Sequence, residues 1–270
     1  MRSVTDFQRA KRRGKPISMV TCYDFWTARI VMQSEIDCIL VGDSAAMVAH
    51  GHDTTIPATA ELMATHVRAV VKGAPEKLVI ADFPFLAHRK GVAAAVDTAD
   101  RLMKAGAQAV KIEGLEGHED VLRSLVEAGV PVMGHLGLTP QSVHAFGGFR
   151  VQAKGRRAAD RLLAEARELE ALGCFGLVLE AIPNDVARQV TEALEIPTIG
   201  IGAGPDTSGQ VLVLQDLLGM NPDFEPRFVR RYLDGFALLK GALDRFAGDV
   251  REGAFPAAEE TYGCSKSSTA

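Results

Sequence analysis

The chain has 270 residues, of which 47% are hydrophobic and 24% are charged. This is the composition of an ordinary globular protein with enough apolar side chains for one large core. The formal net charge of −4 gives no reason to expect nucleic acid or an anionic membrane as a partner.

The four cysteines, Cys22, Cys38, Cys174 and Cys264, are widely spaced and form neither a C-x-x-C motif nor a zinc pairing pattern. No apolar run approaches the roughly 20 residues of a membrane span, and the N-terminus lacks the apolar core of a signal peptide. We therefore expect a cytoplasmic protein with reduced thiols.

Helical and strand patterns alternate along the chain after an N-terminal helix predicted at about 4–13. Strands are predicted near 17–23, 37–42, 77–82, 108–113, 130–135, 174–180, 196–201 and 210–215. Helices are predicted near 25–35, 59–72, 91–105, 117–128, 155–172 and 184–194, followed by a very short element at 205–209 and a long helix at 225–248.

The predicted strands are nearly continuous apolar runs, which indicates burial on both faces and hence a parallel sheet. Eight such strands alternating with helices favour a closed (β/α)8 barrel, with an open doubly wound sheet as the alternative. We expect one catalytic domain over residues 1–258 and a disordered polar tail over 259–270.

Two connections are unusually long. The segment 137–155, after the fifth strand, carries glycine and aromatic residues, and it is predicted to be a lid over the barrel mouth rather than a plain surface insertion. The segment 44–59 contains His50-Gly51-His52-Asp53, which could ligate a metal in principle but is interpreted as a structural turn.

Five apolar runs of strand character end in a carboxylate: Asp24, Asp43, Asp82, Glu113 and Glu180. In a parallel barrel these ends meet at one mouth, where barrel enzymes hold their chemistry. Clustered, poorly hydrated carboxylates are costly to ionise, so such a mouth usually holds a hard divalent cation. We expect Asp43, Asp82 and Glu113 to bind magnesium rather than zinc, because the ligands are oxygens; for either aspartate alone, a helix cap is the simpler interpretation.

Lys111 lies two residues before Glu113, so both side chains project to the same side of the strand, which we expect to be the mouth. A lysine there supplies a positive charge for a substrate carboxylate or an enolate oxygen, and a Schiff-base nucleophile is the alternative. Glu180 ends an apolar segment, and apolar surroundings raise the proton affinity of a carboxylate towards that of a general base. An ion pair or helix cap is the alternative for Glu180, and His135 is either a substrate contact or a structural residue.

These residues lie in segments that resemble those of the ketopantoate hydroxymethyltransferase family. The matching segments are Val41-Gly42-Asp43-Ser44, Gly51-His52-Asp53-Thr54-Thr55-Ile56-Pro57, Ala81-Asp82-Phe83-Pro84-Phe85, Val110-Lys111-Ile112-Glu113-Gly114, Gly134-His135-Leu136-Gly137-Leu138-Thr139-Pro140-Gln141-Ser142, Leu179-Glu180 and Gly200-Ile201-Gly202-Ala203-Gly204. The resemblance runs from about Val4 to Glu260, and His50, His144 and Ala181 depart from the family pattern.

The resemblance implies a (β/α)8 barrel of the phosphoenolpyruvate/pyruvate superfamily that acts in pantothenate synthesis. It implies transfer of the one-carbon unit of 5,10-methylenetetrahydrofolate to 2-oxoisovalerate, with one Mg²⁺ per subunit and a homo-oligomer, a decamer in the family. By resemblance, Asp43 and Asp82 are metal ligands and substrate contacts, and Glu113 is the third acidic residue of the metal site. Ser44 and Lys111 then contact the 2-oxoacid, and Glu180 is the catalytic base.

Two other interpretations of the chain agree less well with its sequence. A magnesium-dependent 2-oxoacid C–C lyase of the isocitrate lyase type would have the same barrel, but those lyases use a cysteine near the lid, and segment 137–155 has none. A non-enzymatic barrel used as a scaffold should have lost its strand-end carboxylates, and all of them are present.

Overall fold

In a computed structural model of the protein, residues 1–263 are described, and the chain divides into two compact units. The first comprises residues 1–214 and 227–229, and the second comprises residues 215–226 and the chain from 230 onward. The predicted extent of the catalytic domain, 1–258, stays a prediction.

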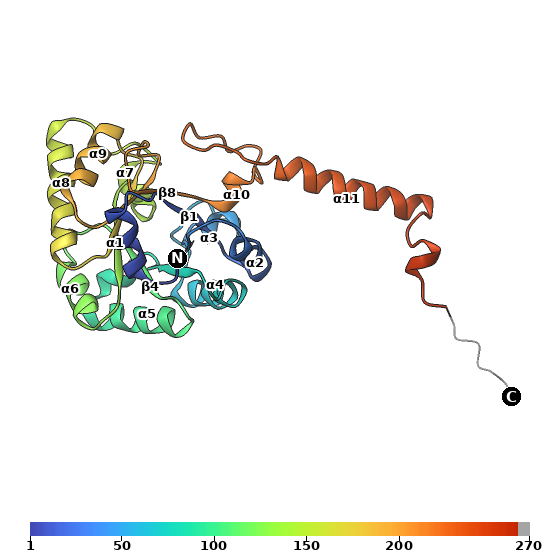
Figure 1. The fold of residues 1–270 in the computed structure, drawn as a ribbon, viewed down its shortest axis with the longest axis horizontal. Coiled ribbons are helices and arrows are strands. Elements are labelled where there is room, and N and C mark those ends of the chain that lie inside the picture. Colours follow the sequence, from blue (N-terminus) through green and yellow to red (C-terminus); the bar gives the residue numbers. More distant parts are fainter. Residues whose placement is uncertain (264–270) are drawn as a thin grey trace. The chain divides into compact units, whose positions relative to one another are not determined.

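The first unit is a closed barrel of eight parallel strands in sequential order, in which β8 pairs with β1 (Figure 1). The strands are β1 Ile17–Thr21, β2 Cys38–Val41, β3 Leu78–Asp82, β4 Ala109–Glu113, β5 Val132–Gly137, β6 Gly176–Glu180, β7 Thr198–Ile201 and β8 Gly209–Leu212. All eight predicted strands are confirmed, and the closed (β/α)8 barrel is confirmed over the open sheet.

The helices are α1 Val4–Arg12, α2 Phe25–Gln33, α3 Ala45–Val48, α4 Ala60–Gly73, α5 Val92–Lys104, α6 Glu119–Glu127, α7 Val143–Phe146, α8 Arg156–Ala171, α9 Asn184–Ala193, α10 Leu214–Leu217 and α11 Gly235–Glu252. Short 3-10 turns are η1 Ala87–Lys90, η2 Pro140–Ser142 and η3 Ala258–Glu260. The predicted helices are confirmed to within about two residues, except the last, which begins ten residues late. The very short element predicted at 205–209 does not form, because β8 begins at Gly209. Asp234 caps it there by accepting a hydrogen bond from the Ala237 amide at 3.3 Å.

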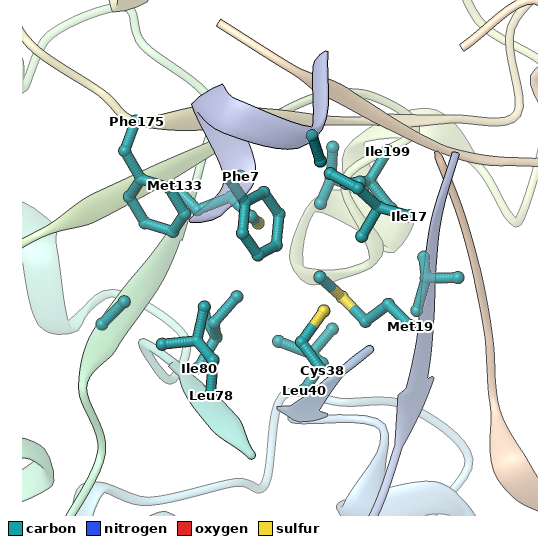
Figure 2. Packing of buried hydrophobic residues seen from close by; sticks show 14 residues of the cluster. Phe7, Ile17, Met19, Cys38, Leu40, Leu78, Ile80, Met133, Phe175 and Ile199 are labelled. Atoms are coloured by element: carbon teal, nitrogen blue, oxygen red, sulfur yellow. The ribbon is translucent and has the colours of Figure 1, made fainter. Parts of the chain in front are cut away.

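The N-terminal end of the barrel is closed by α1 (Figure 2). Phe7 lies edge-on to Phe175 with ring centroids 5.4 Å apart, among inward side chains of the strands. Lys11, from the same helix, donates to the carbonyl oxygens of Thr191, Leu194 and Ile196 at 2.9, 2.5 and 2.9 Å. These contacts fix α1 against the segment that leads from α9 into β7.

On β3 and β4, inward-facing residues change from apolar to charged towards the C-terminal end of the strand. On β3 the inward positions are Leu78, Ile80 and then Asp82, because alternate residues of a strand face the same side. On β4 the same alternation follows Ala109 with Lys111 and Glu113. The apolar layer therefore supports a charged layer above it, at the mouth.

Within the second unit, α11 exposes large apolar side chains: Phe236, Leu239, Leu243 and Phe246 are each about half exposed or more. Among the described residues, no helix combines the length and the apolar character needed to cross a membrane. Of the tail predicted over 259–270, residues 264–270 lie outside the described part of the chain.

Candidate active site

Acidic side chains from neighbouring strands meet at the C-terminal mouth of the barrel. The Asp43 amide donates to Asp82 Oδ2 at 3.0 Å, and Lys111 Nζ lies 2.8 Å from Asp82 Oδ1 and 4.0 Å from Glu113 Oε1. None of these four residues is more than 5% exposed. The strand register explains the arrangement, because Asp82 is aligned with Lys111 across β3 and β4. The expected position of Lys111 and Glu113 at the mouth is therefore correct.

The cluster holds more negative than positive charge. Burial raises the pKa of Asp43 well above its usual range, and the charges of Asp82 and Glu113 raise it further. Burial likewise raises the pKa of Glu113 to about 7, although the Lys111 charge acts in the opposite direction. A divalent cation would favour the ionised form of all three carboxylates.

Lys111 is held as an ammonium ion. Burial alone would lower its pKa, but the carboxylates of Asp82 and Glu113 outweigh burial and raise it above the usual value for lysine. A Schiff-base nucleophile must be a neutral amine. The surroundings of Lys111 therefore favour the electrostatic role over the covalent one.

The carboxylate oxygens at the mouth suit a magnesium ion that is bound directly by only a few protein groups. Among residues 1–263, no group of three or more His, Cys, Asp or Glu side chains is placed to ligate one ion directly. Asp43 and Asp82 form an adjacent pair, and Glu113 Oε1 is buried without a hydrogen-bond partner. Magnesium usually keeps several waters and takes one or two carboxylates, so the residues present fit this cation.

His135 connects Lys111 to Glu180. Lys111 Nζ lies 3.0 Å from His135 Nδ1, and His135 Nε2 lies 3.2 Å from Glu180 Oε2. An ammonium group only donates, so Nδ1 accepts and the neutral ring carries its proton on Nε2, facing Glu180. Burial and the Lys111 charge lower the pKa of His135, which keeps the ring neutral. The structure thus gives His135 a defined place beside the predicted base.

Glu180 differs from the sequence-based expectation. Its side chain is 19% exposed and faces His135 instead of an apolar environment. The preceding residues of β6 are buried, but the carboxylate lies beyond them at the rim. Gly137, aligned with Glu180 on β5, has φ +94°, and a Cβ there would lie 2.3 Å from the Glu180 carbonyl oxygen. Glycine is therefore required at this position by both conformation and space.

Ser44 begins the connection after β2 and is held by Tyr23. The Tyr23 hydroxyl and Ser44 Oγ are 2.8 Å apart, and Tyr23 is buried. A Cβ at Gly42 would lie 2.9 Å from Ser44 Oγ, so the missing side chain leaves room for this contact. Tyr23 was not predicted to be a site residue, although it lies two residues after the end of β1.

Gln141 is a second site residue that the sequence analysis missed. It lies in η2, within the long connection after β5, and its side chain donates to Asp43 Oδ2 at 2.8 Å and to the Phe83 carbonyl at 2.7 Å. Its backbone amide donates to Glu113 Oε2 at 3.1 Å. One residue thus connects the predicted lid to two predicted metal ligands. A polar residue in a Pro-initiated turn next to a strand end is the signal that could have found it.

Asp24 was wrongly placed in the acidic cluster. Its carboxylate caps α2, accepting from the Thr27 amide at 2.9 Å and from the Thr27 hydroxyl at 2.7 Å. A side chain used as a helix cap is directed at the first turn of the helix. Asp24 is therefore a helix cap and not part of the acidic cluster.

A buried histidine pair lies in the connections that follow β3 and β4. The rings of His88 and His118 are 4.5 Å apart, and Arg89 Nε donates to His88 Nε2 at 3.2 Å. Burial, the neighbouring His118 and Arg89 lower the pKa of His88 to about 3. Burial and the Arg89 charge lower the pKa of His118 to about 4. Both rings are neutral at physiological pH.

The family described as ketopantoate hydroxymethyltransferase matches residues 2–258 of the chain. The chain belongs to the ketopantoate hydroxymethyltransferase family. It is accordingly an enzyme, a hydroxymethyltransferase of the pantothenate pathway.

Family members from several bacteria share about half of its residues. A protein of Coxiella burnetii named 3-methyl-2-oxobutanoate hydroxymethyltransferase is 54% identical over 252 residues, covering 93% of this chain and 95% of its own. The protein of that name from Bdellovibrio bacteriovorus is 54% identical over 262 residues, covering 97% and 100%. One from Francisella tularensis is 47% identical over 262 residues, covering 97% and 99%.

Solved structures with the same fold are far more distant in sequence. A 2,3-dimethylmalate lyase of the PEP mutase/isocitrate lyase superfamily has a TM-score of 0.60 at 17% identity, covering 97% of this chain and 92% of its own. A phosphonopyruvate hydrolase, solved with oxalate and Mg²⁺, has a TM-score of 0.63 at 12% identity, covering 96% and 93%. These likenesses show the fold of the ketopantoate hydroxymethyltransferase family and nothing about its reaction.

Proposed function

We propose that the protein transfers a hydroxymethyl group from 5,10-methylenetetrahydrofolate to 2-oxoisovalerate and so forms ketopantoate. The observation that carries the proposal is the buried cluster of Asp43, Asp82, Lys111 and Glu113 at the mouth. It occurs in a chain 54% identical to relatives named for this reaction.

The proposed cofactor is one Mg²⁺ per subunit, held directly by Asp43 and Asp82 and through water by Glu113. When bound, the cation would draw electron density from the ketone oxygen of the 2-oxoacid and make its C3 proton removable. The hydrogen bond from the Asp43 amide to Asp82 Oδ2, which holds these two residues side by side, supports this site.

Two side chains have proposed roles in holding the 2-oxoacid, and one in moving its proton. Lys111 offers its ammonium group to the substrate carboxylate or to the oxygen on which charge develops, and Ser44 offers its hydroxyl. Glu180 accepts the C3 proton, and His135 Nε2 lies 3.2 Å from that carboxylate. The electrons of the broken C–H bond then form the new C–C bond to the one-carbon unit. The methylene carbon loses its bonds to both folate nitrogens: the new C–C bond replaces one, and a C–O bond from water replaces the other. The proton taken from C3 and one proton of that water end on the two nitrogens.

The 137–155 segment is proposed to be a lid that shields this step from solvent. Its contact with the site through Gln141 supports that role, because a movement of η2 would also move donors to Asp43 and Glu113. Its glycines at 147 and 148 have φ +66° and +116°, conformations that glycine adopts easily.

The proposed partners are the two small-molecule substrates and further copies of the chain, not nucleic acid or membrane. The half-exposed apolar side chains of α11 support a homo-oligomer, and the family resemblance proposes a decamer. Mass measured by sedimentation should be several times that of the chain, and Leu243→Lys should reduce it.

A cytoplasmic location is proposed because Cys22, Cys38 and Cys174 are free and buried.

The role of Glu180 can be tested without the folate. Wild-type protein with Mg²⁺ should exchange the C3 proton of 2-oxoisovalerate for deuterium, because proton removal needs only the base, the cation and the 2-oxoacid. Glu180→Gln keeps the shape but cannot accept a proton, so exchange should fall by about 10²–10⁴-fold while substrate binding changes little. Near-normal exchange would move the base role to another group, with His135 the first to examine. Exchange that needs no added Mg²⁺ in chelator-treated protein would remove the proposed metal step.

A further inference from the structure

Two histidines face each other outside the acidic cluster. His50 follows α3 in the 44–59 connection, and His66 lies in the middle of α4. Their Nε2 atoms are 2.9 Å apart, and the ring planes cross at 62° with centroids 5.1 Å apart. His50 is exposed and His66 is half-buried, so the point between the two nitrogens is within reach of solvent. The proposed reaction uses neither residue.

The surrounding contacts fix where the protons of this pair lie. His66 Nδ1 is 2.6 Å from the Tyr23 carbonyl oxygen. A carbonyl only accepts, so Nδ1 carries the proton and the neutral His66 ring has its lone pair on Nε2. His50 Nε2 is therefore the donor in the contact between the rings. Two imidazole nitrogens are aimed at one point, with a single proton between them.

We propose that His50 and His66 form a second cation site that takes a borderline transition-metal ion such as Zn²⁺, Ni²⁺ or Cu²⁺. Neutral imidazole suits these ions, whereas magnesium takes oxygen ligands. Histidine ligands almost always donate their other ring N–H to a carbonyl or carboxylate, and His66 already does so to Tyr23. The pair thus has both the ligand type and the supporting hydrogen bond of a transition-metal site.

The geometry requires little adjustment. At metal–nitrogen distances of about 2.0–2.1 Å, tetrahedral coordination places the two nitrogens about 3.3 Å apart. The observed separation is 2.9 Å, so the rings need to move apart by only about 0.4 Å. The proton between them moves to Nδ1 of His50, and the neutral pair releases no proton when the ion binds.

The two histidines leave part of the coordination shell of the ion unfilled by protein. Among residues 1–263, no third His, Cys, Asp or Glu side chain completes it, so water fills the other coordination positions. An ion there would tie the 44–59 connection to α4. That connection begins at Ser44, which is hydrogen-bonded to Tyr23, and Tyr23 also accepts from His66. Occupancy would therefore reduce the mobility of the connection beside the mouth.

Binding of Zn²⁺ measured by calorimetry in millimolar Mg²⁺ tests the proposal, because magnesium occupies the carboxylate site without competing for imidazole. Wild-type protein should bind one Zn²⁺ that His50→Gln and His66→Gln each bind at least about tenfold more weakly. His52→Gln is the matched control, since His52 is an exposed histidine of the same connection and should leave binding unchanged. His50 is on the surface, so His50→Gln should keep the thermal stability of the wild type.

Electron paramagnetic resonance with Cu²⁺ gives a readout independent of affinity and of enzyme activity. Couplings from two imidazole nitrogens are expected for wild type and His52→Gln, and from at most one for His50→Gln. Equal Zn²⁺ affinity in wild type and His50→Gln would overturn the proposal. So would a Cu²⁺ spectrum showing oxygen ligands only.

Discussion

Replacing Gly137 with alanine should displace Glu180 without altering its chemistry. The added Cβ would lie 2.3 Å from the Glu180 carbonyl oxygen, while real Cβ contacts are essentially never under 3.0 Å. The backbones of β5 and β6 must therefore separate by at least about 0.7 Å. An error of about 1 Å in the position of a reacting group can cost about 100-fold in rate. We expect a loss of that order in C3 deuterium exchange.

The same substitution should lower the free energy of unfolding by about 2–5 kcal/mol. Of this, about 1–2 kcal/mol comes from placing a Cβ at φ +94°, and about 1–3 kcal/mol from overpacking. Gly129→Ala separates the two terms, because Gly129 has φ +85° and no atom within 4 Å of its Cβ position. That control should lose only the first term, as measured by urea unfolding, and should keep normal exchange. Equal stability and equal exchange in the two variants would refute the reasoning.

Three further predictions concern acid sensitivity, Gln141 and the lid. Between pH 6.5 and about 4, His88 and His118 bind protons in the unfolded chain but not in the folded one. The free energy of unfolding should therefore decrease as the pH is lowered, by about 1.4 kcal/mol per pH unit for each histidine. In unfolding measured at several pH values, His88→Leu should reduce this slope by the contribution of one histidine. An unchanged slope would contradict the lowered pKa of His88. Gln141→Ala should cost about 2–4 kcal/mol in urea unfolding, because it removes hydrogen bonds to the Asp43 carboxylate and a buried carbonyl. The control Gln152→Ala, which loses one exposed hydrogen bond to the Arg150 carbonyl, should change stability by less than about 0.5 kcal/mol, and a similar loss in both would count against a special role for Gln141. Saturating substrates should slow amide hydrogen exchange across 137–155, and unchanged exchange there would indicate a static insertion.

The barrel could be predicted from the sequence because burial on both faces imposes long apolar runs on every parallel strand. The positions of Asp82, Lys111 and Glu113 could be predicted in the same way, since alternate residues at the end of a barrel strand face the mouth. It failed for Asp24, because a strand-end carboxylate and a helix cap have the same sequence pattern. Only the contact with Thr27 separates the two.

Residues in connections were harder to predict because no periodicity governs them. Tyr23 and Gln141 reach the site through single hydrogen bonds set by the backbone path, and the contact between His50 and His66 depends on where a loop meets a helix. Segment 225–234 was predicted to be helical, yet the helix begins only where Asp234 can cap it. The lid role and the metal ligands stay predictions.

The seal that α1 forms at the base of the barrel has a consequence for synthesis on the ribosome. Lys11 is bonded to the Ile196 carbonyl, 185 residues later in the chain. At about 5–20 residues per second, translation needs about 10–40 s to supply that partner. During this interval Phe7 has no barrel to enter, and β1 lacks the strand that closes the sheet, β8. The residues of α1 are thus made well before the segments that they contact, and they are among the last to find their native partners.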